Sequence, residues 1–234
     1  MDYNELTKKK EEEEGDLIKR MDEDKDLLYL KKYIMRDATQ KGNAIPDIVN
    51  VTLNRPALFA ANVESALGKT TEQIVVESEV RDFDTAYIED FVRVGFAAAN
   101  ERLIKQAKPQ LNPFLDEQFC IRGRGAMRVL FRMEDGVLIP DIANWDTRYF
   151  RYEVGESGLD WASYKTKRSR AAIEAEYGIV ISNTKGEVLD VWDTEHNEVW
   201  VEGFKILEQE HLYGFTPVVI RVVTLGSMLA DEDS

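Results

Sequence analysis

Apolar residues are sparse at the start of the chain and first recur at helical spacing between Asp24 and Arg36. Steps of three and four residues between them are typical of an amphipathic helix. The residues before Asp24 are dense in charge, with three lysines followed by four glutamates, and we interpret them as a frayed helix or a disordered tail. The pattern therefore predicts a charged helical arm over residues 1–43, which is either solvated or binds a partner, followed by one domain over residues 44–234.

Three more helices are predicted in the first half of the domain. The first covers residues 54–67, because an asparagine N-cap opens it, its apolar residues share one face, and Gly68 is a natural C-terminal stop. The longest covers residues 84–107 and has a broad apolar face, and a short one covers residues 113–119. A run of β-branched residues over residues 74–76 predicts a short strand between the first two helices.

After Gly123 the pattern changes to the alternation of apolar and polar residues that is typical of half-buried strands. Residues 127–133 and 137–142 flank Asp135-Gly136, a strong signal for a β-hairpin. The remaining elements are strands over residues 148–154, 188–192, 198–201, 204–208 and 217–224, and a helix over residues 169–177. Helices followed by a mainly antiparallel sheet with one short helix predict an α+β fold.

Charge limits the functions that the chain can have. The formal net charge is −14, whereas a protein that grips the phosphates of nucleic acid needs a basic surface. The chain as a whole is therefore not expected to hold DNA tightly, although DNA can slide past an acidic wall. The single cysteine, Cys120, excludes an intrachain disulfide and fits an intracellular compartment.

The sequence also predicts a soluble protein. No apolar run approaches the roughly 18 residues that a membrane span needs, and the charged N-terminus lacks the apolar centre of a signal peptide. We therefore expect a protein that is soluble and cytoplasmic when it is made.

Two glycine motifs resemble parts of nucleotide-binding loops. The Gly68-Lys69-Thr70-Thr71 segment lacks the earlier glycine of a P-loop, because Val63 stands there within a predicted helix. We therefore interpret Gly68 as a helix C-cap. In Gly123-Arg124-Gly125 the third glycine of a dinucleotide fingerprint is replaced by Arg128, and a strand follows, so we interpret this segment as a turn.

Asp141, Asp146 and Asp160 fall near strand ends and could bind a divalent ion, although solvated or turn-capping roles are the alternative. A metal-dependent hydrolase or nuclease would use the first two. His196 is expected at a hairpin tip and His211 in a turn, and neither has the spacing of zinc ligands. The sequence therefore predicts no catalytic, cofactor-binding or metal-binding residue, no cofactor and no enzymatic activity.

The aromatic and basic residues of the second half allow two interpretations each. A tryptophan is usually a core residue, but four together also suit a subunit interface, and Trp192 and Trp200 flank one hairpin and could pair across it. The basic clusters suit a nucleic-acid surface or, as we favour in so acidic a chain, salt bridges. Cys120 is expected to behave as a small core residue. The tryptophans are Trp145, Trp161, Trp192 and Trp200, and the clusters are Arg122, Arg124 and Arg128, then Lys165, Lys167, Arg168 and Arg170.

Several longer sequence segments resemble those of a known protein family. They follow one another along the chain in a fixed order: residues 50–59 (NVTLNRPALF), 74–78 (IVVES), 88–91 (IEDF), 98–103 (AANERL), Asp141, 145–149 (WDTRY), 158–162 (GLDWA), 175–178 (AEYG), 187–193 (EVLDVWD) and 211–219 (HLYGFTPVV). Together they resemble the portal proteins of tailed bacteriophages, from about Asp47 onward. The last phrase is similar to the segment of the portal wing where strands return to the core.

The resemblance implies a structural role. Portal subunits form a ring, usually of twelve, at one vertex of the capsid, where the ring nucleates head assembly with scaffold protein. The ring docks the terminase, passes DNA through its channel without sequence-specific binding, and joins the head–tail connector. We therefore expect a virion protein that assembles in the host cytoplasm and does not hydrolyse ATP. Portal subunits typically have several hundred residues, so the resemblance implies a wing-side portion that ends before the stem and clip.

Two other functions remain open from the sequence. The first is the metal-dependent hydrolase or nuclease that would use Asp141 and Asp146. The second is a stand-alone interaction module whose N-terminal arm, from Lys8 to Arg36, folds onto a partner.

Overall fold

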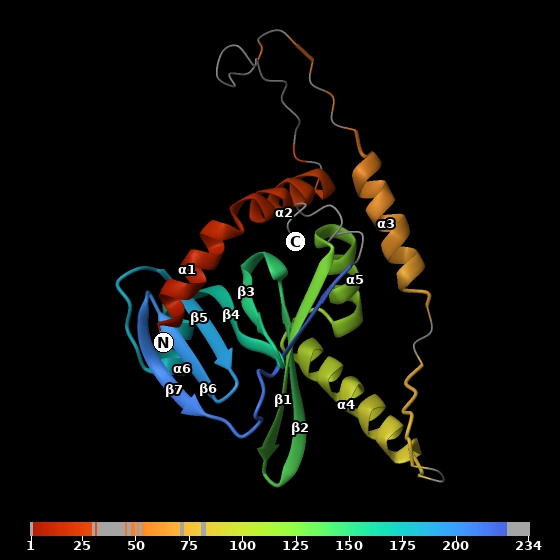
Figure 1. Cartoon of the computed structure of the whole chain (residues 1–234). Helices are drawn as coiled ribbons and strands as arrows, with labels where there is room; N and C mark the ends of the chain where they lie inside the picture. The colour runs from red at the N-terminus through yellow and green to blue at the C-terminus, as the bar shows by residue number, and fades with distance from the viewer. Residues whose placement is uncertain are drawn as a thin grey trace.

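The computed structural model describes residues 2–29, 31, 45, 48–49, 51, 53–70, 73–80 and 83–223 of the 234-residue chain. This part contains six α-helices and two antiparallel sheets, with most of the helices before the strands (Figure 1). The predicted α+β class is therefore confirmed. The helices are α1 (Tyr3–Glu13), α2 (Gly15–Leu28), α3 (Arg55–Leu67), α4 (Ala86–Lys105), α5 (Leu111–Arg122) and α6 (Arg170–Tyr177).

Two predictions in the first half differ from the structure. The helix expected over residues 24–36 is α2, which begins nine residues earlier, at Gly15, and ends at Leu28, while residues 32–36 lie outside the described part. The strand expected over residues 74–76 does not form, and the backbone N–H of Val76 donates instead to Glu89 Oε1 at 3.0 Å. A β-type run forms a strand only beside a partner strand, and no described strand pairs with this one.

The smaller sheet has the strand order β2-β1-β8, formed by β1 (Arg124–Glu134), β2 (Val137–Trp145) and β8 (Val218–Val222). The predicted hairpin is confirmed, since Asp135 and Gly136 connect β1 to β2 with φ angles of 51° and 78°. Positive φ at both positions is the conformation that a two-residue hairpin turn needs. One face of this sheet packs against α4 and α5, and the other packs against the larger sheet.

The larger sheet has the order β3-β4-β5-β6-β7 and comprises β3 (Phe150–Gly155), β4 (Gly158–Ser169), β5 (Lys185–Asp193), β6 (His196–Val201) and β7 (Phe204–Glu210). A 3₁₀ turn over Thr147–Tyr149 precedes β3, so the observed strand begins two residues later than the predicted strand over residues 148–154. The sequence did not predict β4, because Trp161, Ala162 and Ser163 are consecutive and all buried. A strand that is covered on both faces loses the polar alternation.

The four tryptophans are all buried within the chain. Their interpretation as core residues is thus confirmed, and none of the four rings lies on the exposed surface of the chain. The predicted pairing of Trp192 with Trp200 is also wrong, because Trp192 lies opposite Asn197 and Trp200 lies opposite Leu189. The two rings therefore occupy opposite faces of the sheet: Trp192 faces the smaller sheet, and Trp200 lies in the cluster of Tyr3 and Trp161 under α1.

Candidate functional site

We call the first two helices the helix pair. Helix α1 lies across one face of the larger sheet, and α2 continues from it towards α3 and α5 (Figure 1). Helix α1 begins where Asp2 accepts hydrogen bonds from the backbone N–H groups of Asn4 and Glu5, at 3.0 and 3.1 Å. This N-cap satisfies backbone donors that have no partner within the helix. Tyr3 and Thr7 are buried against the sheet, so this part of the predicted arm is packed and not solvated.

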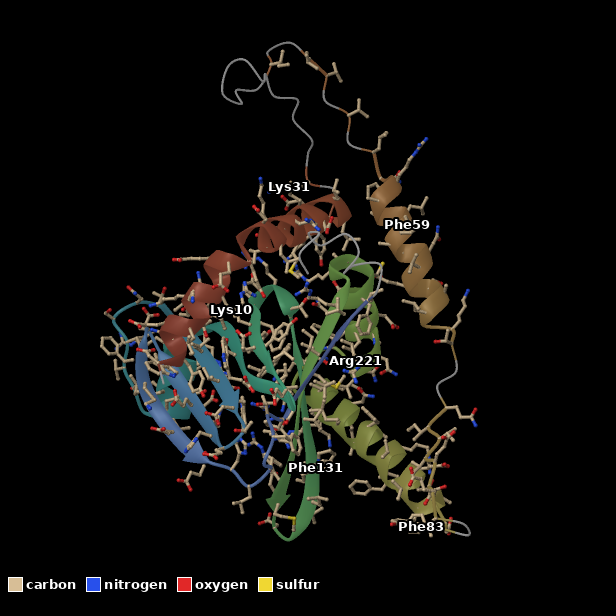
Figure 2. All side chains as sticks on the ribbon, viewed as in Figure 1. Lys10, Lys31, Phe59, Phe83, Phe131 and Arg221 are labelled. Carbon is tan, nitrogen blue, oxygen red and sulfur yellow. The ribbon has the colours of Figure 1, made fainter. Side chains whose placement is uncertain are left out.

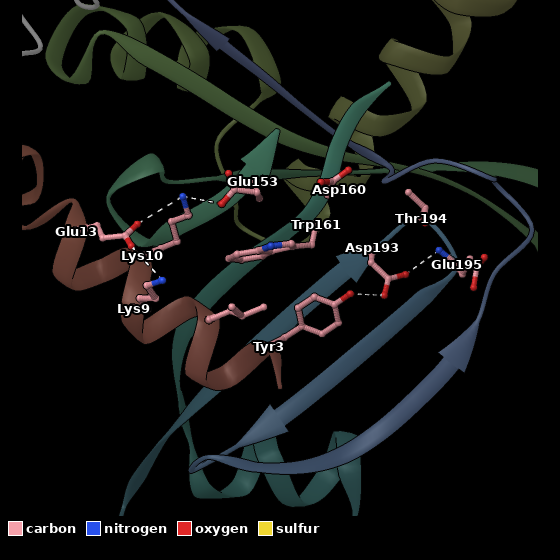
Figure 3. A pocket seen from close by; sticks show the side chains of 11 residues that line it. Tyr3, Lys9, Lys10, Glu13, Glu153, Asp160, Trp161, Asp193, Thr194 and Glu195 are labelled. Carbon is pink, nitrogen blue, oxygen red and sulfur yellow. Dashed lines mark hydrogen bonds and ion pairs between the residues drawn. The ribbon is translucent and has the colours of Figure 1, made fainter. Parts of the chain in front are cut away.

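Tyr3 anchors the start of α1 on the sheet. Its hydroxyl donates to Asp193 Oδ2 at 2.7 Å, and its ring centroid lies 6.0 Å from that of Trp161 (Figure 3). Burial and the bond to Asp193 raise the pKa of the Tyr3 phenol. Burial alone would raise the pKa of Asp193 too, but hydrogen bonds from the backbone N–H groups of Glu195 and His196, and from Tyr3, lower it. Tyr3 stays neutral and Asp193 stays ionised, which is the arrangement that this bond needs.

The middle of α1 contacts the sheet through one hydroxyl pair and two ion pairs. Thr7 Oγ1 donates to Ser163 Oγ at 3.0 Å, and both side chains are buried. On either side of this contact lie two ion pairs, Lys10 with Glu153 at 2.6 Å and Lys165 with Glu11 at 2.8 Å. These contacts fix the register of the helix on the strands, because each partner sits at one position only.

Two arginines bind carboxylates at the junction of α1 and α2 and within α2: one lies on β3 and the other in the 3₁₀ turn before it. Arg151 on β3 is only 1% exposed, and its Nε lies 3.4 Å from Glu14 Oε2. Burial lowers the pKa of Arg151 and raises the pKa of Glu14. Further along, Arg148 donates from Nε and a terminal nitrogen to the two carboxylate oxygens of Asp22, at 2.8 and 3.0 Å. This two-pronged geometry is the most directional ion pair available to proteins.

We call the surface beneath the helix pair the seat, and it is formed by Arg148, Arg151, Glu153, Trp161, Ser163, Lys165 and Asp193. An open cavity of about 520 Å³ lies at its edge, between α1 and the ends of β4 and β5 (Figure 3). Tyr3 and Trp161 line it, together with Lys10 and the carboxylates of Glu13 and Glu153. Lys10 pairs with both of these carboxylates, at 3.6 and 2.6 Å. The cavity is therefore part of the contact between helix and sheet.

The seat was largely missed by the sequence analysis, which singled out only Trp161 and Lys165. The helix pair carried a signal, since Tyr3, Thr7 and Lys10 follow one another at steps of four and three residues and so share one helix face. Because that face is mostly polar, it was indistinguishable from a solvated one.

The three predicted acidic candidates lie apart in different surroundings. Asp141 is buried on β2, 2.7 Å from Arg132 and 3.4 Å from Arg128. Asp146 pairs with Arg122 at 3.0 Å, and it also caps the 3₁₀ turn. Asp160 lines the edge of the cavity beside the seat. The turn-capping alternative is thus confirmed for Asp146. Within the described ranges, no group of three or more His, Cys, Asp or Glu side chains could hold a metal ion.

The histidines and the cysteine have structural surroundings. His211 stacks on Trp192 with ring centroids 5.4 Å apart, and its Nε2 lies 3.1 Å from the carbonyl oxygen of Asp193. His196 is the first residue of β6, one residue beyond the tip of the hairpin. Cys120 is half-buried on α5, and burial raises the pKa of its thiol. It lines a second, mostly apolar cavity of about 550 Å³ between α2, α3, α5 and the end of β8.

The glycine predictions are confirmed, and the salt-bridge prediction is confirmed for four of the seven basic residues. The N–H of Gly68 bonds to the carbonyl oxygen of Glu64 and caps α3. Gly123 has a φ of 66° and ends α5 directly before β1, as the predicted turn requires. The basic clusters form ion pairs in four cases: Arg122 with Asp146, Arg128 with Asp141 and Asp190, Lys165 with Glu11 and Glu187, and Arg168 with Glu176.

The second notable surface is apolar and exposed. Tyr87, Phe91 and Val94 on α4 are 63%, 51% and 57% exposed, at steps of four and three residues along one side of the helix. Phe131 of β1, which lies beside α4 (Figure 2), is 44% exposed, and Met133, two residues further along the strand, is 66% exposed. The rings of Phe91 and Phe131 stack with centroids 6.1 Å apart. We call these five side chains the apolar patch.

The apolar patch belongs to a helix with two apolar sides. Ala99 and Leu103 point inward and pack with Leu111 and Ile142, whereas the patch faces outward. The sequence pattern predicts a broad apolar face on this helix. In the structure these apolar residues lie on two sides of α4, one buried and one exposed.

None of the helices in the described residues is both long and apolar enough to cross a membrane. No protein-family model matches this chain, and no curated protein matches it either.

Proposed function

We propose that this chain is a structural subunit of a homo-oligomeric ring of the portal type, through which DNA passes at one vertex of a phage capsid. The observation that carries the proposal is the apolar patch on α4 and β1. The sequence segments that resemble portal proteins are the reason why we propose a ring of the portal type. Terminase, scaffold and capsid proteins, the head–tail connector and a location in the virion belong to the same proposal.

The patch has the composition of a subunit interface. Monomeric soluble proteins rarely expose large contiguous apolar areas, and aromatic residues and methionine are enriched where subunits meet. Three of the five side chains are aromatic and one is a methionine. Burying a side chain of this size contributes about 1.5–3 kcal/mol, so a neighbour that covers the patch is strongly favoured.

The acidic balance of the chain supports a channel role. With a formal net charge of −14, the surface repels the phosphate backbone, and DNA can move past such a wall without being held. The basic residues of the predicted clusters are largely paired with carboxylates of the same chain, as Arg128 is with Asp141 and Asp190.

The structure favours neither alternative function. Asp141 and Asp146, on which the hydrolase hypothesis depends, are each bound to arginines. The interaction-module hypothesis needs an arm that folds onto a different protein, whereas α1 packs on the larger sheet of this chain and α2 packs against α3 and α5.

The test is self-association of the purified chain and of a matched pair of variants. Val94→Asp places a charge in the patch, and Ala97→Asp places the same charge at an exposed position on another side of α4. We expect oligomers in light scattering after gel filtration, rings in negative-stain electron microscopy, and an association at least about tenfold weaker in Val94→Asp, which corresponds to about 1.4 kcal/mol. The Ala97→Asp variant should associate like the wild type.

Two results would contradict the proposal. A wild-type chain that stays monomeric at its highest soluble concentration would remove the subunit role. A closed dimer would remove the ring, because a ring requires head-to-tail contact between two different surfaces.

A further inference from the structure

The helix pair is attached to the body of the protein by side chains. Among the described residues, no backbone–backbone hydrogen bond joins residues 2–29 to the larger sheet. On the seat the attachment consists of these contacts: Tyr3 with Asp193, Thr7 with Ser163, Lys10 with Glu153, Glu11 with Lys165, Glu14 with Arg151, and Asp22 with Arg148. Helix α2 also packs against α3 and α5, where Met21 is buried and its carbonyl oxygen accepts a hydrogen bond from Arg122. The larger sheet keeps its full strand pairing without the pair. The helix pair is therefore a separable unit with a position-specific surface.

The seat requires an occupant of one particular chemistry. Arg148, Arg151 and Lys165 all face carboxylates of the helix pair, and Arg151 is almost completely buried beneath it. An uncovered seat would leave Arg148 and Arg151 without their carboxylates, would take one of two carboxylates from Lys165, and would expose the ring of Trp161. A fitting occupant is an acidic helix with a tyrosine, a threonine and a lysine in this order and spacing. A second copy of this chain carries that helix.

The connection between the helix pair and the body is long enough for exchange between copies. Residues 30–54 join α2 to α3, and a fully extended chain of this length spans roughly 80 Å. Every contact in the seat is the same whether the helix pair belongs to the same chain or to a neighbour, so exchange costs no contact. Swapping an identical element between copies is a low-cost route to an oligomer for this reason.

The exchange is compatible with a ring. The helix pair and the seat are two different surfaces of one chain, so a copy can lend its helix pair to one neighbour and receive another from the opposite side. Head-to-tail contacts of this kind can close into rings, whereas a reciprocal exchange between two copies closes a dimer. We propose that in the oligomer the helix pair of each copy occupies the seat of a neighbouring copy. The inference rests on the proposed function, because it requires an oligomer.

A disulfide between two differently tagged copies tests the exchange. Thr7 Oγ1 and Ser163 Oγ are 3.0 Å apart, so cysteines at these positions lie within reach of each other. One copy carries Thr7→Cys, the other carries Ser163→Cys, and both carry Cys120→Ser; the two are coexpressed and oxidised with copper phenanthroline. Exchange predicts a reducible band of two chains that contains both tags. The control replaces Ser163→Cys by Lys167→Cys, which lies on the same strand roughly 13 Å further along, and should give no such band.

The opposite result is equally clear. If a single chain with both Thr7→Cys and Ser163→Cys forms its disulfide internally, and the mixed copies form none, the helix pair stays on its own chain and the inference is wrong. Light scattering of the same preparations separates the two proposals. A monomeric preparation overturns the ring and the exchange together, whereas an oligomer that contains only intrachain disulfides overturns the exchange alone.

Discussion

Two surfaces of this molecule are suited to bind a partner, and their side chains differ in chemistry. The seat is polar, and each of its charged groups meets a counterpart on the helix pair. The apolar patch on α4 and β1 has large side chains with no described neighbour above them. Charged and hydroxyl contacts define position, because they fail when displaced by one residue, whereas apolar contacts supply affinity and tolerate displacement. The seat is therefore suited to fix which segment binds, and the patch to hold copies together.

The largest expected effect comes from removing the buried cation of the seat. Arg151→Ala leaves Glu14 without its partner and the carbonyl oxygens of Arg148 and Phe150 without their donor. Breaking a buried ion pair in this way costs about 3 kcal/mol or more. We expect a loss of that size in the free energy of unfolding, measured by urea denaturation.

The matched change in the apolar patch is Met133→Ala. Its side chain is mostly exposed already, so the free energy of unfolding of the monomer should change by less than about 0.5 kcal/mol. Equal losses in the two variants would contradict the distinction between a seat that is part of the folded chain and a patch that awaits a neighbour.

Hydrophobic periodicity predicted the apolar side of α4 but not the polar face of α1 that contacts the seat. The broad apolar side of α4 was predictable, because apolar residues at helical spacing indicate packing whether or not the partner is in the same chain. The face of α1 was not, because Thr7, Lys10 and Glu14 have the composition of a solvated helix and their burial is decided by partners far away in sequence. Hydrophobic periodicity carries no information about polar contacts of this kind.

The larger sheet shows the same limit. Strands β5 and β6 were predicted because β-branched and aromatic residues mark them, but the twelve-residue β4 was not. Its centre, Trp161 to Ser163, is covered by α1 on one side and by the smaller sheet on the other. Only the three-dimensional arrangement reveals that both faces of this strand are buried. A similar limit applies to the hypothesis that Asp141 and Asp146 bind a metal ion. Their arginine partners lie on other elements, so the sequence did not show that these carboxylates are paired.

A smaller effect is expected from the anchor of α1, and it depends on pH. Asp193 is half-buried, which would raise its pKa, but it accepts three hydrogen bonds, and these lower its pKa below the ordinary value of 3.8. An acid with a lowered pKa in the folded state contributes stability above its ordinary pKa, and this contribution is lost as the pH falls through the folded value. Asp193→Asn should therefore lower the free energy of unfolding by about 1.5–3 kcal/mol at pH 7, and the difference from wild type should shrink below pH 4.

Glu14 has the opposite pH dependence but does not disturb that measurement. Burial raises its pKa, so its contribution has the opposite sign: it is present at low pH and is lost as the pH rises through the folded value. Because Glu14 is present in both proteins, its contribution cancels in the difference between wild type and Asp193→Asn. A difference that stays constant from pH 7 to pH 2, in denaturation curves at each pH, would show that Asp193 does not anchor α1 through its charge.

The smallest expected effect concerns the N-cap of α1, and it bears most directly on whether the helix pair is separable. Asp2→Ala removes the acceptor for the backbone N–H groups of Asn4 and Glu5 and should destabilise α1 by about 0.5–1 kcal/mol. If the helix pair opens as a unit, hydrogen exchange of the α1 amides will accelerate severalfold while the β5 amides, including that of Val191, keep their wild-type rate. Equal acceleration in α1 and β5 would mean that α1 leaves the sheet only when the whole domain unfolds. The helix pair would then be an integral part of the fold, and a neighbour could receive it only during folding.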